Sequence, residues 1–319
     1  MSIVVQSSEA DWYEASARER VDGLLDPRSF TEFVGPSQRE MSPHLAQFGL
    51  TGAFDDGMVI GRGKLARQSV FVAAQEGRFL GGAFGEVHGA KLVGLLRAAR
   101  DGADQGGPRA VLLLFDTGGV RLQEANAGEL AICETIRAVI ETRTAGISVV
   151  ALIGGRAGAF GGCGIITACC SRIVVSRHTR ISVTGPEVIE TNKGVEEFDS
   201  KDRALVWRVT GGRTRYVMGG ADRYVGARIS DFRDAAISLL ADPPLFAMET
   251  LRAEQQRLAE RLKEYGACRD APEIWREAGL PEPNRVTEIP DAAFRAISRL
   301  KEAGHEISSC TSVRKRRRV

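Results

Sequence analysis

Two glycine pairs in the sequence stand where backbone amides could do chemistry. Gly118-Gly119 follows a strand-like apolar segment, and Gly161-Gly162 opens a segment of small and apolar residues. Glycine allows positive φ angles and lets a ligand approach the backbone without a Cβ in the way. A turn from a strand into a helix also leaves N–H groups unpaired at the positive end of the helix dipole. Two such amides directed at one carbonyl oxygen would form an oxyanion hole.

Side chains that commonly act as catalysts are scarce. The sequence has four histidines, which show no metal-ligand spacing and no nucleophile partner: His44, His88, His178 and His305. His88 is close to the glycine-rich segment 79–90, so it is the histidine with the best chance of lining a site. No G-x-S-x-G motif is present, which argues against an α/β-hydrolase. An enzyme with this sequence would therefore work mainly through backbone hydrogen bonds.

Two nucleotide-binding alternatives are weak. Gly158, Gly161, Gly162 and Gly164 suggest the dinucleotide fingerprint G-x-G-x-x-G, but their spacing does not fit, and Ser176 stands where an acidic residue is expected. No Gly-Lys-Ser/Thr motif is present, so a phosphate loop is not predicted. The interpretation in which the glycines only permit tight turns and close packing remains open.

The elements that would position these turns alternate between strands and helices. Strands are predicted at 58–65, 69–75, 109–116, 147–154, 171–176 and 179–185. Helices are predicted at 8–25, 120–142, 163–170, 201–212, 229–241 and 245–265, with a glycine-rich entry into another helix after residue 79. Strand, glycine turn, helix and strand in repetition predicts a parallel sheet with crossover helices.

The chain divides into three predicted parts. We expect an N-terminal helical and irregular extension at 1–56, an α/β domain at 57–240, and a C-terminal helical extension at 241–319. The last part ends in five consecutive basic residues, 314–318, and removing them changes the net charge from +2 to −3. The body of the protein is therefore not an electrostatic nucleic-acid binder. The tail is either a solvated end or a contact for an acidic partner.

Cysteine usage and hydropathy indicate the compartment. None of the six cysteines forms a C-x-x-C pair, so no zinc ribbon or other metal site is predicted. No signal-like start is visible, and no apolar run reaches the roughly 18 residues that a membrane span needs. We expect a cytoplasmic protein that contacts neither membrane nor nucleic acid.

Motifs in a fixed order carry a resemblance to a known family. In chain order they are GRGKLARQSVFVAAQ with FLGGAFGEVHGAK, LLLFDTGGVRLQEAN, GGRAGAFGGCG and RISVTGPEVIE. Over roughly residues 25 to 240 the chain resembles the acyl-CoA carboxyltransferase branch of the crotonase superfamily. Within that branch it is most similar to the β subunits of biotin-independent malonate decarboxylases. The resemblance implies an α/β fold, a crotonase-like ββα-superhelix with helical N- and C-terminal extensions.

The resemblance also implies a mechanism and its donors. A malonyl thioester would lose CO2, and the resulting enolate oxygen would be held in the hole. The first donor would be the amide of Gly119 or Val120, and the second that of Gly161 or Gly162. Hydrogen bonds stronger to the enolate than to the carbonyl are what catalysis requires. Gly162→Val is then expected to reduce activity steeply while the complex with the partner still folds.

The cofactor that the resemblance implies is the group that carries the acyl substrate, not a group attached to this chain. Gly81, Gly82 and Gly118 would line the channel for a phosphopantetheine-type prosthetic group, derived from dephospho-CoA, on an acyl carrier protein, or for CoA. We expect Arg121 to face either protein structure or the phosphates of that group rather than the malonyl carboxylate. No covalently bound cofactor is expected in the chain itself. A related γ carboxyltransferase-like subunit would complete the complex.

Two alternatives to the decarboxylase remain. A biotin-dependent acyl-CoA carboxyltransferase subunit would share the same holes, although the four-cysteine zinc module of bacterial acetyl-CoA carboxyltransferase β chains is absent. A non-catalytic assembly subunit would only bind the carrier protein or a partner. The sequence does not identify the donor of the proton to the enolate; Gln123, Glu124 and Glu187 are near the motifs, but we expect them to be structural or exposed.

Overall fold

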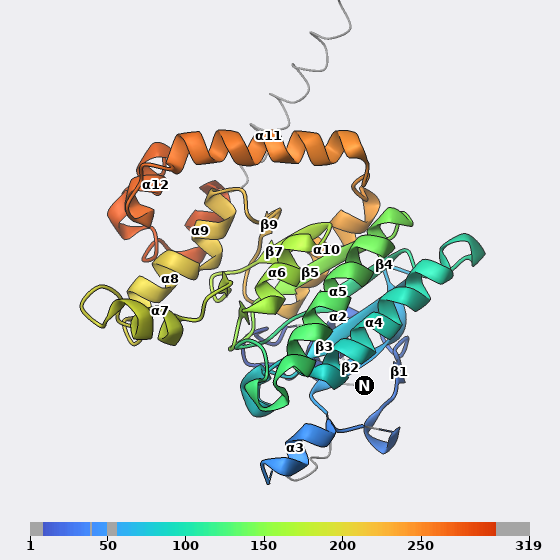
Figure 1. Ribbon diagram of the computed structural model, residues 1–319. Helices are drawn as coiled ribbons and strands as arrows, with labels where there is room; N and C mark the ends of the chain where they lie inside the picture. Colours follow the sequence, from blue (N-terminus) through green and yellow to red (C-terminus); the bar gives the residue numbers. More distant parts are fainter. Residues whose placement is uncertain (1–8, 39, 50–55, 298–319) are drawn as a thin grey trace, which may run out of the picture.

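Apolar segments of the sequence form the centre of a seven-stranded sheet in the computed structural model, which describes residues 9–38, 40–49 and 56–297 (Figure 1). In sheet order the strands are β1 (Thr31–Phe33), β2 (Met58–Leu65), β3 (Gln68–Gln75), β4 (Ala110–Leu114), β5 (Ser148–Ile153), β7 (Arg172–Val175) and β9 (Arg223–Tyr224). The first three are antiparallel, and the pairs from β3 to β9 are parallel. Every residue of β4 and β5 is buried, as expected of inner parallel strands.

The predicted hairpin of β2 and β3 is confirmed, and its turn depends on the N-terminal part of the chain. Ala66 and Arg67 adopt positive φ angles of 48° and 66°, which side chains rarely tolerate. The Asp26 carboxylate accepts hydrogen bonds from both amides, at 3.1 and 2.8 Å. A residue of the predicted extension therefore stabilises a turn of the predicted domain.

Helices cover both faces of the sheet. One face packs against α4 (Glu86–Asp101), α5 (Asn126–Thr144) and α6 (Gly162–Cys169). The other face packs against α2 (Ala17–Leu24) and α10 (Ile229–Ala241). A small second sheet of β6 (Ala159–Phe160) and β8 (Ile181–Ser182) flanks α6. The predicted α/β fold is confirmed, although the strand predicted at 179–185 is reduced to Ile181–Ser182 and one isolated bridge from Arg180 to Gly211.

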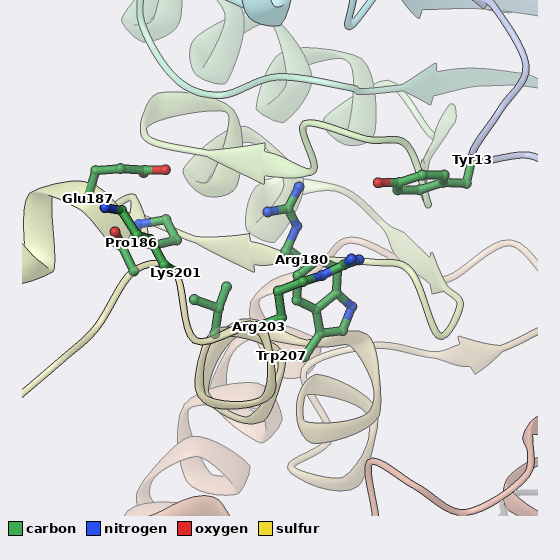
Figure 2. Close-up of a pocket in the computed structure, with 9 residues that line it drawn as sticks. Tyr13, Arg180, Pro186, Glu187, Lys201, Arg203 and Trp207 are labelled. Atoms are coloured by element: carbon green, nitrogen blue, oxygen red, sulfur yellow. The ribbon is translucent and has the colours of Figure 1, made fainter.

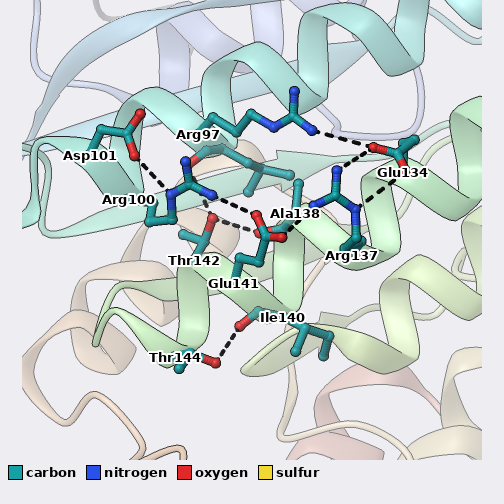
Figure 3. A network of polar contacts seen from close by, with 11 residues as sticks. Arg97, Arg100, Asp101, Glu134, Arg137, Ala138, Ile140, Glu141, Thr142 and Thr144 are labelled. Carbon is teal, nitrogen blue, oxygen red and sulfur yellow. Dashed lines mark hydrogen bonds and ion pairs between the residues drawn. The ribbon is translucent and has the colours of Figure 1, made fainter.

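Packing rather than surface charge holds α4 against α5, which lie side by side in Figure 1. Their exposed sides carry a network of ion pairs, including Arg100 with Glu141 at 2.6 Å and Arg97 with Glu134 at 3.3 Å (Figure 3). Exposed ion pairs typically contribute about 0–1 kcal/mol each. The network lies on the C-terminal half of α4, away from the turn that precedes this helix.

The N-terminal segment is part of the domain core. Trp12 is buried and stacks on Phe232 of α10 at a centroid distance of 4.0 Å. Helix α2 begins later than predicted because Ser16 and Glu19 form a capping box, in which each side chain bonds the other residue's amide. Strand β1, which also lies before residue 56, pairs with β2. These contacts join the first part of the chain to the sheet.

Helices form much of the described part of the predicted C-terminal extension. The remaining helices are α3 (Pro43–Gln47), α7 (Pro186–Lys193), α8 (Arg203–Thr210), α9 (Gly212–Val217), α11 (Met248–Tyr265) and α12 (Ala271–Glu277). Trp275 and Phe294 pack with Tyr224 in a separate core at the β9 edge of the sheet. Helix α11 has no buried residue and spans the top of the molecule in Figure 1. The basic tail lies outside the described residues. Within the described ranges, no helix combines the length and hydropathy needed to cross a membrane.

Candidate active site

Three glycine turns lie at the same edge of the sheet. Each follows the carboxyl end of a parallel strand: Gly81-Gly82 comes after β3, Gly118-Gly119 after β4, and Gly161-Gly162 after β5 and β6. Because β3, β4 and β5 are neighbours and parallel, the loops that follow them must meet at one edge. The alternation of strands and glycine turns in the sequence therefore translates into a single location.

Backbone hydrogen bonds join the three turns. Thr117 donates its amide to the carbonyl of Gly158 at 2.8 Å and accepts one from the amide of Phe160 at 3.2 Å. On the other side, Phe84 donates to the carbonyl of Gly119 at 2.8 Å, and Arg121 donates to that of Phe84 at 2.9 Å. The turn after β4 is thus held between the turn after β3 and the turn after β5.

The turns approach one another most closely at Gly82, where a side chain would not fit, and less closely at Gly161. A Cβ on Gly82 would lie 2.1 Å from the carbonyl oxygen of Asp116. A Cβ on Gly161 would lie 3.3 Å from the Cα of Gly119 and 3.6 Å from the amide nitrogen of Val120. The structure therefore brings together the glycines that the sequence singled out, and Gly161 leaves open the space in front of the Val120 amide.

Two of the four predicted donor amides are free for a ligand. The Gly119 amide donates to the Thr117 hydroxyl at 3.1 Å. On either side of Val120, the carbonyl of Gly119 and the amide of Arg121 bond to Phe84, so the Val120 amide points away from Phe84. This amide has no hydrogen-bond partner in the described part of the chain.

At the second turn, too, the two candidate amides differ in what they face. Along β6 the amide of Ala159 faces β8 and that of Phe160 faces Thr117, so the Gly161 amide points back toward Ser182 on β8. Gly162 is the first residue of α6, where an amide has no intrahelical acceptor, and it too lacks a partner among the residues described. Val120 and Gly162 are therefore the donors that the geometry favours. Both residues are partly exposed to solvent.

The structure alters the expected effect of Gly162→Val. A Cβ on Gly162 would lie 2.6 Å from two side-chain carbons of Ile132, which is buried in α5. The valine would therefore disturb the packing of α6 on α5 as well as the site. A loss of activity in this variant would therefore combine an effect on the site with an effect on helix packing, and it would not isolate the role of the amide.

Arg121 faces protein structure. Its side chain is only 2% exposed and donates to Glu124 and to the carbonyl of Ala83, both at 2.8 Å. Glu124 in turn accepts from the amide of Glu86 at the start of α4. This buried pair fixes the turn after β4 against the turn after β3, and it leaves the guanidinium no room to reach a phosphate. Of the two roles expected for Arg121, the structural one agrees with its position.

The remaining polar residues near the motifs lie elsewhere. His88 is fully buried beneath the turns, with its Nε2 atom 2.7 Å from the carbonyl oxygen of Asp56, so it does not line the site. Gln123 is exposed, Arg156 pairs with Glu14 at the surface, and Glu187 lines a separate cleft. These positions give no proton donor for an enolate.

Asp116, which the sequence analysis did not single out, connects the turns. One carboxylate oxygen accepts from the amide of Ala157 at 2.6 Å, and the other pairs with Arg20 of α2 at 2.8 Å. Both side chains are almost fully buried. A Cβ on Gly155 would lie 2.2 Å from this carboxylate, so the loop after β5 wraps directly around it. An acidic residue at the end of an apolar strand was the available signal, but its partner lies 96 residues earlier in the chain.

The buried thiols near the turns should be inert. Burial raises the pKa of Cys163 and Cys170, so neither thiol should ionise near neutral pH. Cys133 on α5 is exposed. With iodoacetamide at pH 8, we expect native protein to be labelled at Cys133 and to resist labelling at Cys163 and Cys170 until it is unfolded. Peptide mass spectrometry measures this, and rapid native labelling of Cys163 would contradict the described packing.

A largely parallel sheet whose carboxyl edge carries three neighbouring glycine turns agrees with the crotonase-like class that the sequence resembles. Residues 14–242 match the family model of the carboxyl transferase domain, so the chain belongs to the carboxyl transferase family. The predicted resemblance to this branch of the crotonase superfamily is confirmed.

Similar proteins within this family indicate which reactions its members catalyse. The chain is 37% identical over 311 residues to the malonyl-S-ACP:biotin-protein carboxyltransferase MADC of Malonomonas rubra, covering 92% of this chain and 97% of the relative. A crystal structure of a Pseudomonas malonate decarboxylase hetero-tetramer in complex with malonate matches with a TM-score of 0.76 and 36% identity, covering 86% of this chain and all of that one. Transcarboxylase 12S, with bound methylmalonyl-CoA, matches with a TM-score of 0.61 and 25% identity, and the match covers 42% of that chain. These relatives support a malonate-related carboxyltransferase or decarboxylase role and a partner subunit.

Proposed function

We propose that this chain is the β-type subunit of a malonate decarboxylase, which converts a malonyl thioester on an acyl carrier protein to the acetyl thioester and CO2. The observation that carries the proposal is that the unpartnered Val120 amide lies 3.6 Å from where a Cβ on Gly161 would be, directly before Gly162, the first residue of α6. Its relatives with malonyl and malonate in their names support the choice of substrate.

The chemistry needs little beyond that pair of amides. The bond between the malonyl carboxylate and the α-carbon breaks, and its electron pair moves into the thioester carbonyl to give an enolate and CO2. The two amides donate to the oxygen as its negative charge grows, and the positive end of α6 adds to this stabilisation. A proton from water or a side chain then adds to the α-carbon and gives the acetyl thioester.

The partners and location belong to the same proposal. A related γ carboxyltransferase-like subunit would sit beside this chain, which the hetero-tetramer and hetero-dimer compositions of the matching Pseudomonas structures support. The carrier protein would deliver the malonyl group on its phosphopantetheine-type arm. The cysteines that the structure describes are free thiols, which agrees with a cytoplasmic location.

A second candidate function is carboxyl transfer from the malonyl thioester to a biotin protein. It is favoured by the name of the Malonomonas rubra relative, which matches almost over its full length. Both functions would pass through the same enolate and use the same amides. They differ in whether CO2 leaves directly or is captured by biotin.

Avidin separates the two functions. The chain is purified with its partner subunits, and acetyl-thioester formation from the malonyl carrier protein is measured with and without excess avidin. The proposal predicts unchanged turnover with avidin, together with release of one CO2 per acetyl thioester. Inhibition by avidin would establish biotin-dependent transfer instead. An inactive complex that still binds the carrier protein would indicate an assembly subunit.

A further inference from the structure

A second feature of the molecule, beside the glycine turns, collects unpaired positive charge. A cleft of about 300 Å³ lies between the small sheet and the start of α8, at the lower end of the volumes typical of ligand pockets. Its charged lining consists of Arg180, Lys201, Arg203 and Glu187, so it carries three cations and one carboxylate. None of the three cations forms an ion pair with any residue that the structure describes. In this they differ from the neighbouring Arg156, which pairs with Glu14.

Arg180 is held as if to receive an anion. Its guanidinium lies over the rings of Phe160 and Trp207, at 5.7 and 4.6 Å from their centroids. Its Nε atom is buried and has no hydrogen-bond partner among the described residues. Burial is also the main cause that lowers the pKa of this group. A terminal nitrogen of the guanidinium donates to the carbonyl of Arg156, but its positive charge has no carboxylate partner among the described residues, so an incoming oxyanion would supply the counter-ion.

The lining residues surround this guanidinium on several sides. In Figure 2 the hydroxyl of Tyr13 and the carboxylate of Glu187 point toward Arg180 from opposite sides of the cleft. Arg203 lies against Trp207, with its guanidinium 5.2 Å from the ring centroid. The indole is thereby placed between two arginines, and the charge inside the cleft is net positive.

The cleft adjoins the glycine turns. Arg180 precedes β8, which pairs with β6, and the amide of Ala159 donates to the Arg180 carbonyl at 2.9 Å. Gly158 packs against the backbone of Arg180, and Gly161 comes three residues later. Three residues of a strand span about 10 Å. An anion in the cleft and a thioester oxygen at the turns could therefore belong to one ligand.

We propose that the Arg180 cleft binds a phosphate group of the acyl-carrying arm, whether that arm is free CoA or the prosthetic group of a carrier protein. Three cations against one carboxylate suit a phosphate better than the single charge of a malonyl carboxylate. The backbone of Arg180 also lies at Gly158, about 10 Å of strand from Gly161, whereas a malonyl carboxylate is only two bonds removed from the thioester carbonyl. The inference rests on the proposed function.

The test compares substrates with and without a phosphate. Turnover of malonyl-CoA, malonyl carrier protein and malonyl-N-acetylcysteamine, which lacks phosphate, is measured with the intact complex. Arg180→Met, Lys201→Gln and Arg203→Gln should each reduce the preference for the two phosphate-bearing substrates by about tenfold or more, mainly through KM. Glu187→Gln removes the opposing charge and should increase that preference. A loss restricted to one of these two substrates identifies the source of the phosphate.

Lys193→Gln is the matched control, since it removes one exposed cation from α7 outside the cleft and should leave the preference unchanged. Equal losses on all three substrates in the cleft variants would overturn the proposal and point to the malonyl carboxylate. If the wild type processes none of the thioesters, the proposed function fails, and calorimetry with inorganic pyrophosphate decides separately. Binding that is lost in Arg180→Met supports the cleft, whereas absent or unchanged binding overturns it.

Discussion

Replacing Gly161 with alanine should reduce kcat for malonyl-thioester decarboxylation by about 10²- to 10³-fold, the loss typical of removing one oxyanion-hole donor. The new methyl group would lie 3.6 Å from the Val120 nitrogen and occupy the space where the enolate oxygen should sit. Its three nearest neighbours there are atoms of Gly119 and Val120, so the methyl blocks the site without entering the core. Turnover of a malonyl thioester by the intact complex measures the effect.

Backbone strain needs its own control, because Gly161 combines a φ of 61° with a ψ of −137°, a conformation that residues with a Cβ rarely adopt. Gly146 has a φ of 81°, is exposed, and has open space where a Cβ would go. It follows the far end of α5, about 27 Å along that helix from the turn that precedes it. Gly146→Ala also places a side chain at a positive φ angle, and it should keep full activity. Wild-type activity in Gly161→Ala, with the protein folded, would remove this turn from the mechanism.

The location of the site could be predicted because it depends on local patterns. Apolar runs followed by glycine pairs identify the carboxyl ends of parallel strands, and the topology of such strands brings those ends together. Gly118-Gly119 and Gly161-Gly162 were therefore recognisable from the sequence alone. The sequence also favoured backbone donors, since it offers no grouped side-chain catalysts.

The choice among neighbouring amides could not be predicted. Whether Gly119 or Val120 presents a free N–H depends on the Thr117 hydroxyl, which accepts from Gly119, and on the bridge to Phe84. Whether position 162 tolerates a side chain depends on Ile132, a residue of the preceding helix. These contacts arise from tertiary packing, for which a linear pattern carries no signal.

Long-range charge pairs were missed for the same reason. Arg20 lies in a segment predicted as an extension, and nothing near it in the sequence suggests a buried partner. In the structure it pairs with Asp116, and its Nε also donates to the carbonyl of Trp12 at 2.8 Å. The N-terminal helix is thereby tied to the strand end that leads into the site. The family match, which begins at residue 14, agrees with this arrangement.

Asp116→Ala should destabilise the protein by about 3–5 kcal/mol, because it leaves the Arg20 charge buried without a counter-ion. It also removes the acceptor for the Ala157 amide, so the loop between β5 and Gly161 loses its anchor. We therefore expect a lower kcat even in conditions where the variant is fully folded. Urea unfolding and thioester turnover measure the two effects.

The double variant Arg20→Met with Asp116→Asn tests whether the effect comes from the buried charges or from the hydrogen bond to the Ala157 amide. It removes both charges and keeps an acceptor for the Ala157 amide, so its loss of stability should be smaller than the sum of the single losses. Glu32→Gln is the matched control: it breaks an exposed pair of the same helix, Arg18 with Glu32, and should cost at most about 1 kcal/mol. Additive losses in the double variant would mean that Arg20 and Asp116 are not coupled. In that case the N-terminal helix would stabilise the sheet through Trp12 and its apolar neighbours alone, and the site would not depend on this ion pair.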